Sequence, residues 1–323
     1  MFEPSQRAGI FGWYLLGPLL GPTLGPLFGG IIVQNLGWRW VFWSLTIVCM
    51  INTALGIVFL KESYAPVVLE ARRQHRVKEE GGSYRLKNEY EDSRPFWTKL
   101  ASSMQRPLKI LFTQPIVLTM AIYQAITFAT LYTLYTNFED IYGVIYGFTI
   151  TQVGLMYLGP GIGFLVAVWF LVPKIDTVYN TLSRRNNDCP KPEFRLPLAN
   201  IGSIFIPASL FWFAWTVETR QHWLVTISSM LFFGIGQVTV LNCVQNYYID
   251  SFSRYAASAI AAGAVFRSVI GGLAPLFAPS VFDKVGYGWG VSIFGFLSVA
   301  IAPAPILFFY YGERIRNRYA IEL

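Results

Sequence analysis

The chain has 323 residues, of which 54% are hydrophobic and only 13% are charged, whereas about 25% are charged in ordinary soluble domains. A core of this length cannot bury so much apolar surface, which excludes a soluble globular protein, a disordered chain and a protein whose main activity is nucleic-acid binding. The composition is typical of an integral membrane protein, and the net charge of +7 is explained below by its distribution.

Eight segments are mostly apolar over about 20 residues or more, the length that a spanning helix needs. None of them alternates apolar and polar residues as a β-barrel strand would. The first is too long for the apolar region of a signal peptide, so we expect it to stay in the membrane. The sequence therefore predicts an all-α membrane protein with about eight transmembrane helices, at residues 9–33, 39–60, 113–137, 147–173, 197–217, 223–247, 256–280 and 288–311.

The first span contains the most specific pattern in the chain, a run of glycines at four-residue spacing in which prolines follow the first three. Glycines at this spacing share one face of a helix, where a neighbouring backbone can approach closely. Each proline removes an amide donor and strains the turn before it. We therefore expect a bent helix whose bend matters to a conformational cycle, formed by Gly17, Pro18, Gly21, Pro22, Gly25, Pro26, Gly29 and Gly30.

Basic residues gather in two of the segments between the spans. Residues 61–112 hold eleven Lys and Arg, and residues 174–196 hold five, while the opposite side has only Arg39, Arg220 and Lys284. By the positive-inside rule the basic side is cytoplasmic, which places both termini in the cytoplasm. Residues 61–112 also hold seven acids, and we interpret them as a cytoplasmic linker with amphipathic pieces such as residues 96–100 at the membrane interface. A regulatory site is the alternative.

The Gly-Pro run resembles the antiporter motif in the fifth helix of drug:proton antiporters of the major facilitator superfamily, in the 12-spanner branch of the fungal multidrug and polyamine type. Further segments are similar to that branch, namely residues 36–43, 61–63, 192–197, 247–252, 254–259 and 311–316. The resemblance implies a major facilitator-type helical bundle, in which this chain supplies the counterparts of spans five to twelve and lacks the first four.

The same resemblance implies a division of the chain. Residues 1–60 are the remainder of the N-terminal half-bundle, and residues 61–112 are the linker loop. Residues 113–312 form a six-helix C-terminal half-bundle, and residues 313–323 form a cytoplasmic tail.

Polar side chains within the spans are the candidates for a substrate pathway. Arg267 is the only ionisable residue well inside a span, and such a group must face a wet cavity, an acid or backbone carbonyls. Its role is either a substrate or gating contact or a structural one. The remaining pathway candidates are Tyr123, Gln124, Thr127, Tyr132, Gln237 and Asn242, for which hydrogen bonding between helices is the alternative. Asp250 and Arg254 are four residues apart and could form a cytoplasmic gate pair.

The sequence offers no enzyme site. It has two histidines, no metal-binding cluster and no phosphate-binding loop, and its three cysteines show no pairing pattern. We therefore predict no enzymatic activity and no cofactor, with a proton gradient as the energy source. The resemblance implies a monomeric, multi-pass transporter of the plasma membrane that contacts lipid and exports small drug-like, metabolite or polyamine-like solutes by alternating access. A non-transporting membrane remnant or a receptor-like membrane protein is the alternative.

Overall fold

The computed structural model describes residues 7–60, 62, 65–79, 95–252 and 255–319, and all regular structure within them is helical. The chain forms two compact units, residues 1–35 with 104–323, and residues 36–103. The helices are α1 (Arg7–Leu36), α2 (Arg39–Phe59), α3 (Ala65–Glu79), α4 (Phe96–Thr113), α5 (Pro115–Thr136), η2 (Glu139–Ile145), α6 (Ile150–Met156), α7 (Leu158–Val166), η3 (Ala167–Leu171), α8 (Val172–Arg185), η4 (Pro192–Arg195), α9 (Ala199–Glu218), α10 (Trp223–Ser251), α11 (Ala256–Ile301) and α12 (Ala304–Arg318).

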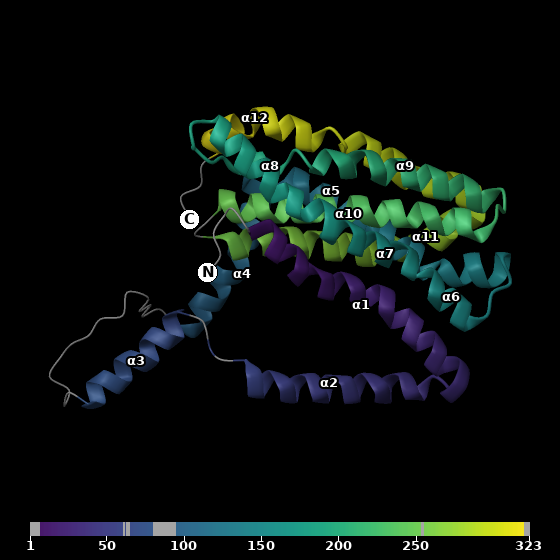
Figure 1. Cartoon of the computed structure of the whole chain (residues 1–323), viewed down its shortest axis with the longest axis horizontal. Coiled ribbons are helices and arrows are strands. Elements are labelled where there is room, and N and C mark those ends of the chain that lie inside the picture. The colour runs from purple at the N-terminus through teal and green to yellow at the C-terminus, as the bar shows by residue number, and fades with distance from the viewer. Residues whose placement is uncertain (1–6, 61, 63–64, 80–94, 253–254, 320–323) are drawn as a thin grey trace. The chain divides into compact units, whose positions relative to one another are not determined.

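Four long helices form the centre of the larger unit. Helix α11 packs along α5 and α9, and α10 packs along α9 and α7, so these helices run side by side in Figure 1. Glycines permit the closest approaches: a Cβ at Gly163 of α7 would lie 2.2 Å from the carbonyl oxygen of Leu231 on α10. Small residues let apolar helices pack backbone against backbone, where lipid supplies no hydrophobic drive for association.

Helix α1 belongs to this larger unit and is helical from Arg7 to Leu36, with three prolines inside it. Its buried side chains recur at helical spacing, at Ala8, Leu15, Leu19 and Thr23. This spacing indicates one helix face turned toward the bundle. The prolines therefore lie within a continuous helix that contacts the bundle along one face.

Helix α11 contains a break that matters for the number of spans. Gly286 has a φ of +77°, which interrupts the helical conformation inside its 46 residues. Glycine is suited to this left-handed conformation because it has no Cβ. The break is held in place by Glu218 of α9, whose carboxylate accepts a hydrogen bond from the Gly288 amide at 2.9 Å.

Seven helical stretches of the described chain are long and apolar enough to cross a membrane. The last of them contains 63 residues, which at 1.5 Å per residue is about three times the thickness of the hydrocarbon core. With its break at Gly286, this stretch accommodates both predicted spans, 256–280 and 288–311. The stretches are Ala8–Leu36, Arg39–Phe59, Pro115–Ile145, Ile150–Arg185, Ala199–Glu218, Trp223–Ser251 and Ala256–Arg318.

The smaller unit, residues 36–103, contains α2, α3 and the start of α4. Helix α2 is apolar over 21 residues and buries none of them, as expected of a helix that meets lipid or a partner rather than a water-soluble core. Helix α3 is charged, and Arg73 pairs with Glu70 one turn earlier at 2.7 Å. The predicted linker, residues 61–112, thus contains helical segments, and its cytoplasmic placement stays a prediction.

Candidate functional site

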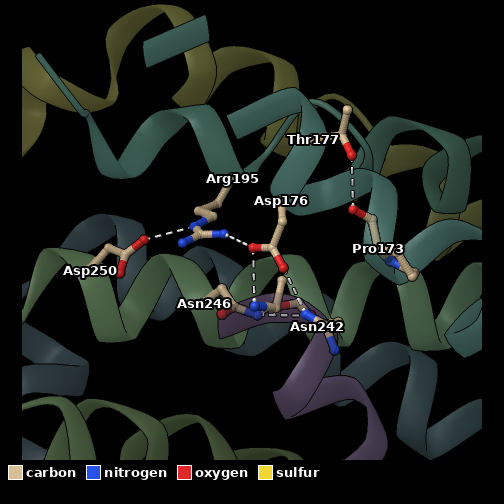
Figure 2. Close-up of polar contacts among 9 residues, drawn as sticks. Pro173, Asp176, Thr177, Arg195, Asn242, Asn246 and Asp250 are labelled. Carbon is tan, nitrogen blue, oxygen red and sulfur yellow. Dashed lines mark hydrogen bonds and ion pairs between the residues drawn. The ribbon is translucent and has the colours of Figure 1, made fainter. Parts of the chain in front are cut away.

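Three charged side chains meet at one end of the larger unit, and they are called the ion cluster below: Asp176 of α8, Arg195 of η4 and Asp250 of α10. Arg195 donates from Nη1 to Asp176 Oδ1 at 2.7 Å and from Nε to Asp250 Oδ2 at 2.7 Å (Figure 2). The arginine side chain is fully buried, and the two carboxylates are only 12% and 9% exposed. A buried arginine therefore bridges two acids from different helices.

The ion cluster also holds the start of α1. The Asp176 carboxylate accepts hydrogen bonds from the backbone amides of Ala8 at 3.1 Å and of Gly9 at 2.9 Å. The first amides of a helix have no partner within the helix, and they form its positive end. Asp176 thus caps α1 from another helix, and Figure 2 shows it between Arg195 and that helix end.

The surroundings favour a rigid arrangement of these charges. The guanidinium of Arg195 lies 3.8 Å from the ring centre of Tyr179, which is one turn beyond Asp176 on α8. Breaking a buried ion pair by removing one partner costs about 3–5 kcal/mol because the other charge stays buried. The ion pair therefore keeps the Asp176 carboxylate in position, and this carboxylate can act as a latch that holds the start of α1 through the amides of Ala8 and Gly9.

The predicted gate pair is only partly described in the structure. Arg254 lies outside the described residues, so its pairing with Asp250 stays a prediction. Asp250 also belongs to the ion cluster, because it pairs with Arg195, which lies 55 positions earlier in the chain.

A cavity of about 530 Å³ lies between α1, α5, α10 and α11. Its volume is in the range of sites for small organic ligands. Its wall is mostly apolar, and among the predicted pathway residues it contains Arg267 and Tyr132. The lining residues are Leu15, Pro18, Leu19, Pro22, Phe128, Leu131, Tyr132, Thr136, Leu241, Arg267, Ser268, Gly271, Gly272 and Pro275.

The cavity and the ion cluster share helices. Leu15 and Leu19 of α1 line the cavity, and the cluster binds Ala8 and Gly9 of the same helix. The leucines are separated from Ala8 and Gly9 by about 10–15 Å along the axis of α1. The capped end of α1 therefore lies toward one end of the cavity, so that movement of this end would alter the cavity wall.

The other predicted residues of α5 do not line the cavity. The Tyr123 hydroxyl donates to Ser203 Oγ on α9 at 3.0 Å, and Thr127 donates back to the carbonyl of Gln124 at 2.9 Å. All three are buried, and none lines the cavity. Tyr123 and Thr127 thus bond within and between helices, as the alternative interpretation expected, while Gln124 Nε2 has no hydrogen-bond partner within the described chain, and a place for these residues in a pathway stays a prediction.

The predicted residues of α10 are buried as well. Asn242 accepts a hydrogen bond from Asn246 at 2.7 Å, as Figure 2 shows. The amide nitrogen of Asn242 and both polar atoms of the Gln237 amide have no hydrogen-bond partner within the described chain. Neither residue lines the cavity, so their place in a pathway stays a prediction.

The glycines of α1 behave differently from the expectation of close packing. A Cβ at Gly17, Gly21, Gly25 or Gly29 would meet no described atom within 4 Å. Close approach occurs beside this row, because Gly154 of α6 would place a Cβ only 2.8 Å from the carbonyl oxygen of Pro26. A Cβ at Gly30 would likewise lie 3.0 Å from the carbonyl oxygen of Ile150. The contact is therefore made largely by the glycine of the neighbouring helix, and the role of the Gly-Pro row in a conformational cycle stays a prediction.

Sequence reasoning missed Asp176 and Arg195 as a pair. Asp176 lies three residues after the predicted span 147–173, and Arg195 lies in a segment counted only as basic loop. The sequence held one signal, since Asp176 and Tyr179 are three residues apart and share a helix face. Their meeting with Arg195 depends on the turn between α8 and α9, which no periodicity predicts.

Comparisons with known proteins agree with this architecture. The family model described as Major Facilitator Superfamily matches residues 1–275. The MFS transporter cpaT of Aspergillus oryzae is 39% identical, with 100% of this chain and 65% of that protein covered. The MFS-type transporter penM of Penicillium rubens is 39% identical, covering 98% and 62%.

The efflux pump vrtL of Penicillium aethiopicum is 38% identical, with 99% of this chain and 64% of that protein covered. The chain therefore spans a little under two thirds of the length of these three relatives. Together with the seven helical stretches of the described chain that are long and apolar enough to cross a membrane, these matches identify an integral, multi-pass membrane protein.

Proposed function

The chain belongs to the Major Facilitator Superfamily, and we propose that it acts in a secondary active transporter that exports a small molecule by alternating access, with protons as the coupling ion. One observation carries the proposal: the cavity and the buried ion cluster share α1. Transporters of this kind place the substrate near the membrane centre between helix groups that move relative to one another. A helix that is capped at one end and lines a cavity with its next turns is suited to that movement.

Alternating access requires a contact that forms in one state and breaks in another. The ion cluster is suited to this role, because within the described residues Asp176 contacts α1 through two backbone amides, while its ion pair joins it to Arg195. If α1 leaves, the Asp176–Arg195–Asp250 bridge stays intact and no buried charge is stranded. The cluster can therefore release the helix without losing its own pairing.

The finer parts of the proposal come from the sequence. Proton coupling is supported by the resemblance of residues 17–30 to an antiporter motif, and a cytoplasmic position of both termini is supported by the basic segments. We also propose a monomer in the plasma membrane that needs no cofactor. The substrate is a small solute whose apolar part fits the wall formed by Leu15, Leu19 and Leu131.

Transport by the purified chain in proteoliposomes tests the proposal. Three tritiated tracers share a naphthalene ring, namely naphthalenesulfonate, naphthalenesulfonamide and naphthylmethylammonium, which are anionic, neutral and cationic at neutral pH. We expect at least one tracer to accumulate when a pH gradient is imposed, and to stop accumulating when a protonophore collapses it. Liposomes without protein give the passive background. Accumulation of all three tracers equal to that background would refute transport by this chain.

A further inference from the structure

The cavity contains one cation and no acid among its lining residues. From this we infer that the substrate is an amphipathic organic anion, whose charged group pairs with Arg267 while its apolar body lies against α1 and α10. The inference deepens the proposed function and rests on it. It chooses between the metabolite-like and polyamine-like solutes that the sequence left open.

Arg267 is held in position without having its charge paired. Its guanidinium lies 4.7 Å from the ring centre of Phe128 on α5, which fixes the plane of the group. Its Nη1 is fully buried, yet it has no hydrogen-bond acceptor in the described part of the chain. Buried polar groups are nearly always hydrogen-bonded, and a buried charge costs more than a neutral group to leave unmatched. This nitrogen therefore marks a place where an acceptor from a ligand would be stabilised.

The neighbours of Arg267 complete a site for an anionic head group. Ser268 follows it on α11, and Tyr132 lies across the cavity wall on α5, so two hydroxyl-bearing side chains accompany the guanidinium. The rest of the lining consists of aliphatic, aromatic, proline and glycine residues and Thr136. A polar end and an apolar wall in one cavity match a ligand with a charged group at one end of a hydrocarbon or aromatic body.

The same geometry disfavours a cationic substrate. The ring of Phe128 could attract a cation, but Arg267 already covers it. A polyamine in this cavity would lie next to a like charge in a weakly screened environment, where repulsion is strong. A neutral carbonyl could accept a hydrogen bond from Arg267, but charge-assisted bonds to carboxylate, sulfonate or phosphate groups are about twice as strong.

The inference is tested by equilibrium binding of the three naphthalene tracers to the purified full chain in detergent, measured by scintillation proximity. We expect naphthalenesulfonate to bind at least about tenfold more tightly than naphthalenesulfonamide, which corresponds to the gain from one charge-assisted hydrogen bond. Naphthylmethylammonium should bind most weakly. Because this order is measured on the unmodified chain, it does not depend on a variant that folds.

Variants of Arg267 then test whether the preference for the anionic tracer depends on this residue. Arg267→Gln should weaken binding of the anion far more than binding of the neutral tracer and so remove the preference for the anion, whereas Arg267→Lys should keep part of that preference. Arg184→Gln removes an equal charge from an exposed position on α8 and should change nothing. Equal binding of the three tracers, tightest binding of the cation, or an anion preference that survives Arg267→Gln would each overturn the inference.

The two proposals fail separately. If the unmodified chain accumulates a tracer but shows no preference for the anion, transport stands and the substrate class is wrong. If it binds the anion preferentially through Arg267 but accumulates none of the tracers, the site stands and the transport proposal fails.

Discussion

Removal of the negative charge at Asp176 is the sharpest perturbation of the latch that connects α1 to α8. The carboxylate accepts three hydrogen bonds, from the amides of Ala8 and Gly9 and from Arg195. In Asp176→Asn the side chain keeps its shape but has one acceptor oxygen, and its amide group presents donors to other donors. Its oxygen can still accept from Ala8 and Arg195, which both bond to Oδ1, but the Gly9 amide loses its acceptor Oδ2 and the charge opposite Arg195 is removed.

The magnitude follows from the contacts that are lost. A hydrogen bond to a charged group contributes about 1.5–3 kcal/mol, and a helix N-cap about 0.5–2 kcal/mol. Asparagine loses the bond from Gly9 and keeps the bonds from Ala8 and Arg195 in a weaker, uncharged form, and Arg195 keeps its bond to Asp250. We therefore expect the free energy of local opening at this end to fall by about 2–3 kcal/mol.

Cys243 provides the assay, because it is a native thiol that is fully buried on α10, two turns before Asp250. Cys49 and Cys189 are exposed and are first replaced by serine. Alkylation of Cys243 by a maleimide then requires local opening, and its rate reports the opening equilibrium. A change of about 2–3 kcal/mol predicts alkylation roughly 30- to 150-fold faster in Asp176→Asn.

The control is Thr177→Ala, on the next residue of α8, which loses an exposed hydrogen bond to the carbonyl of Pro173. It should leave the alkylation rate of Cys243 nearly unchanged. An unchanged rate in Asp176→Asn would refute the reasoning, because the contacts of the carboxylate would then contribute nothing to holding this end closed.

Three further predictions concern packing and orientation. Gly163→Ala should destabilise the chain by about 1–3 kcal/mol in detergent unfolding, because its Cβ would overlap the α10 backbone, while Gly21→Ala, with open space around it, should not destabilise it. Gly286→Ala should lower the free energy of unfolding by about 1–2 kcal/mol, because alanine disfavours the positive φ at this position. Gly272→Ala on the same helix should leave the free energy of unfolding unchanged, and equal thermal midpoints for the two variants would contradict this prediction. Cys189, which is exposed in the loop after α8, should react with a membrane-impermeant maleimide only in permeabilised cells, and labelling of intact cells would reverse the proposed topology.

Several features were predictable from sequence because they depend on composition and on local spacing. Apolar length identified the spans, and the family match confirms the membrane fold and the assignment to this superfamily. Membership in a transporter family also supports the prediction that the chain is not an enzyme. The break at Gly286 falls between the predicted spans 256–280 and 288–311, where the chain was expected to turn.

The site was less predictable because its partners are far apart in the chain. Helical periodicity shows which residues share a face, but not what that face meets: Tyr132 faces the cavity, whereas Tyr123 bonds to α9. Spacing of four residues suggested Asp250 with Arg254, and that pair stays a prediction, but no spacing pointed to the bond between Asp250 and Arg195, which lies 55 positions away. The same limit applies to Asp176, whose role as the cap of α1 depends on two helices that meet only in the folded bundle.

The most direct test of the account is the distance between the start of α1 and α8 during transport. Spin labels at Ile10→Cys and Thr177→Cys, both exposed positions, in a chain whose native cysteines are replaced by serine, report this distance in proteoliposomes. We predict two populations of distances, and the population at the longer distance should grow when a pH gradient and a transported tracer are present. A single population that stays unchanged under those conditions would contradict it.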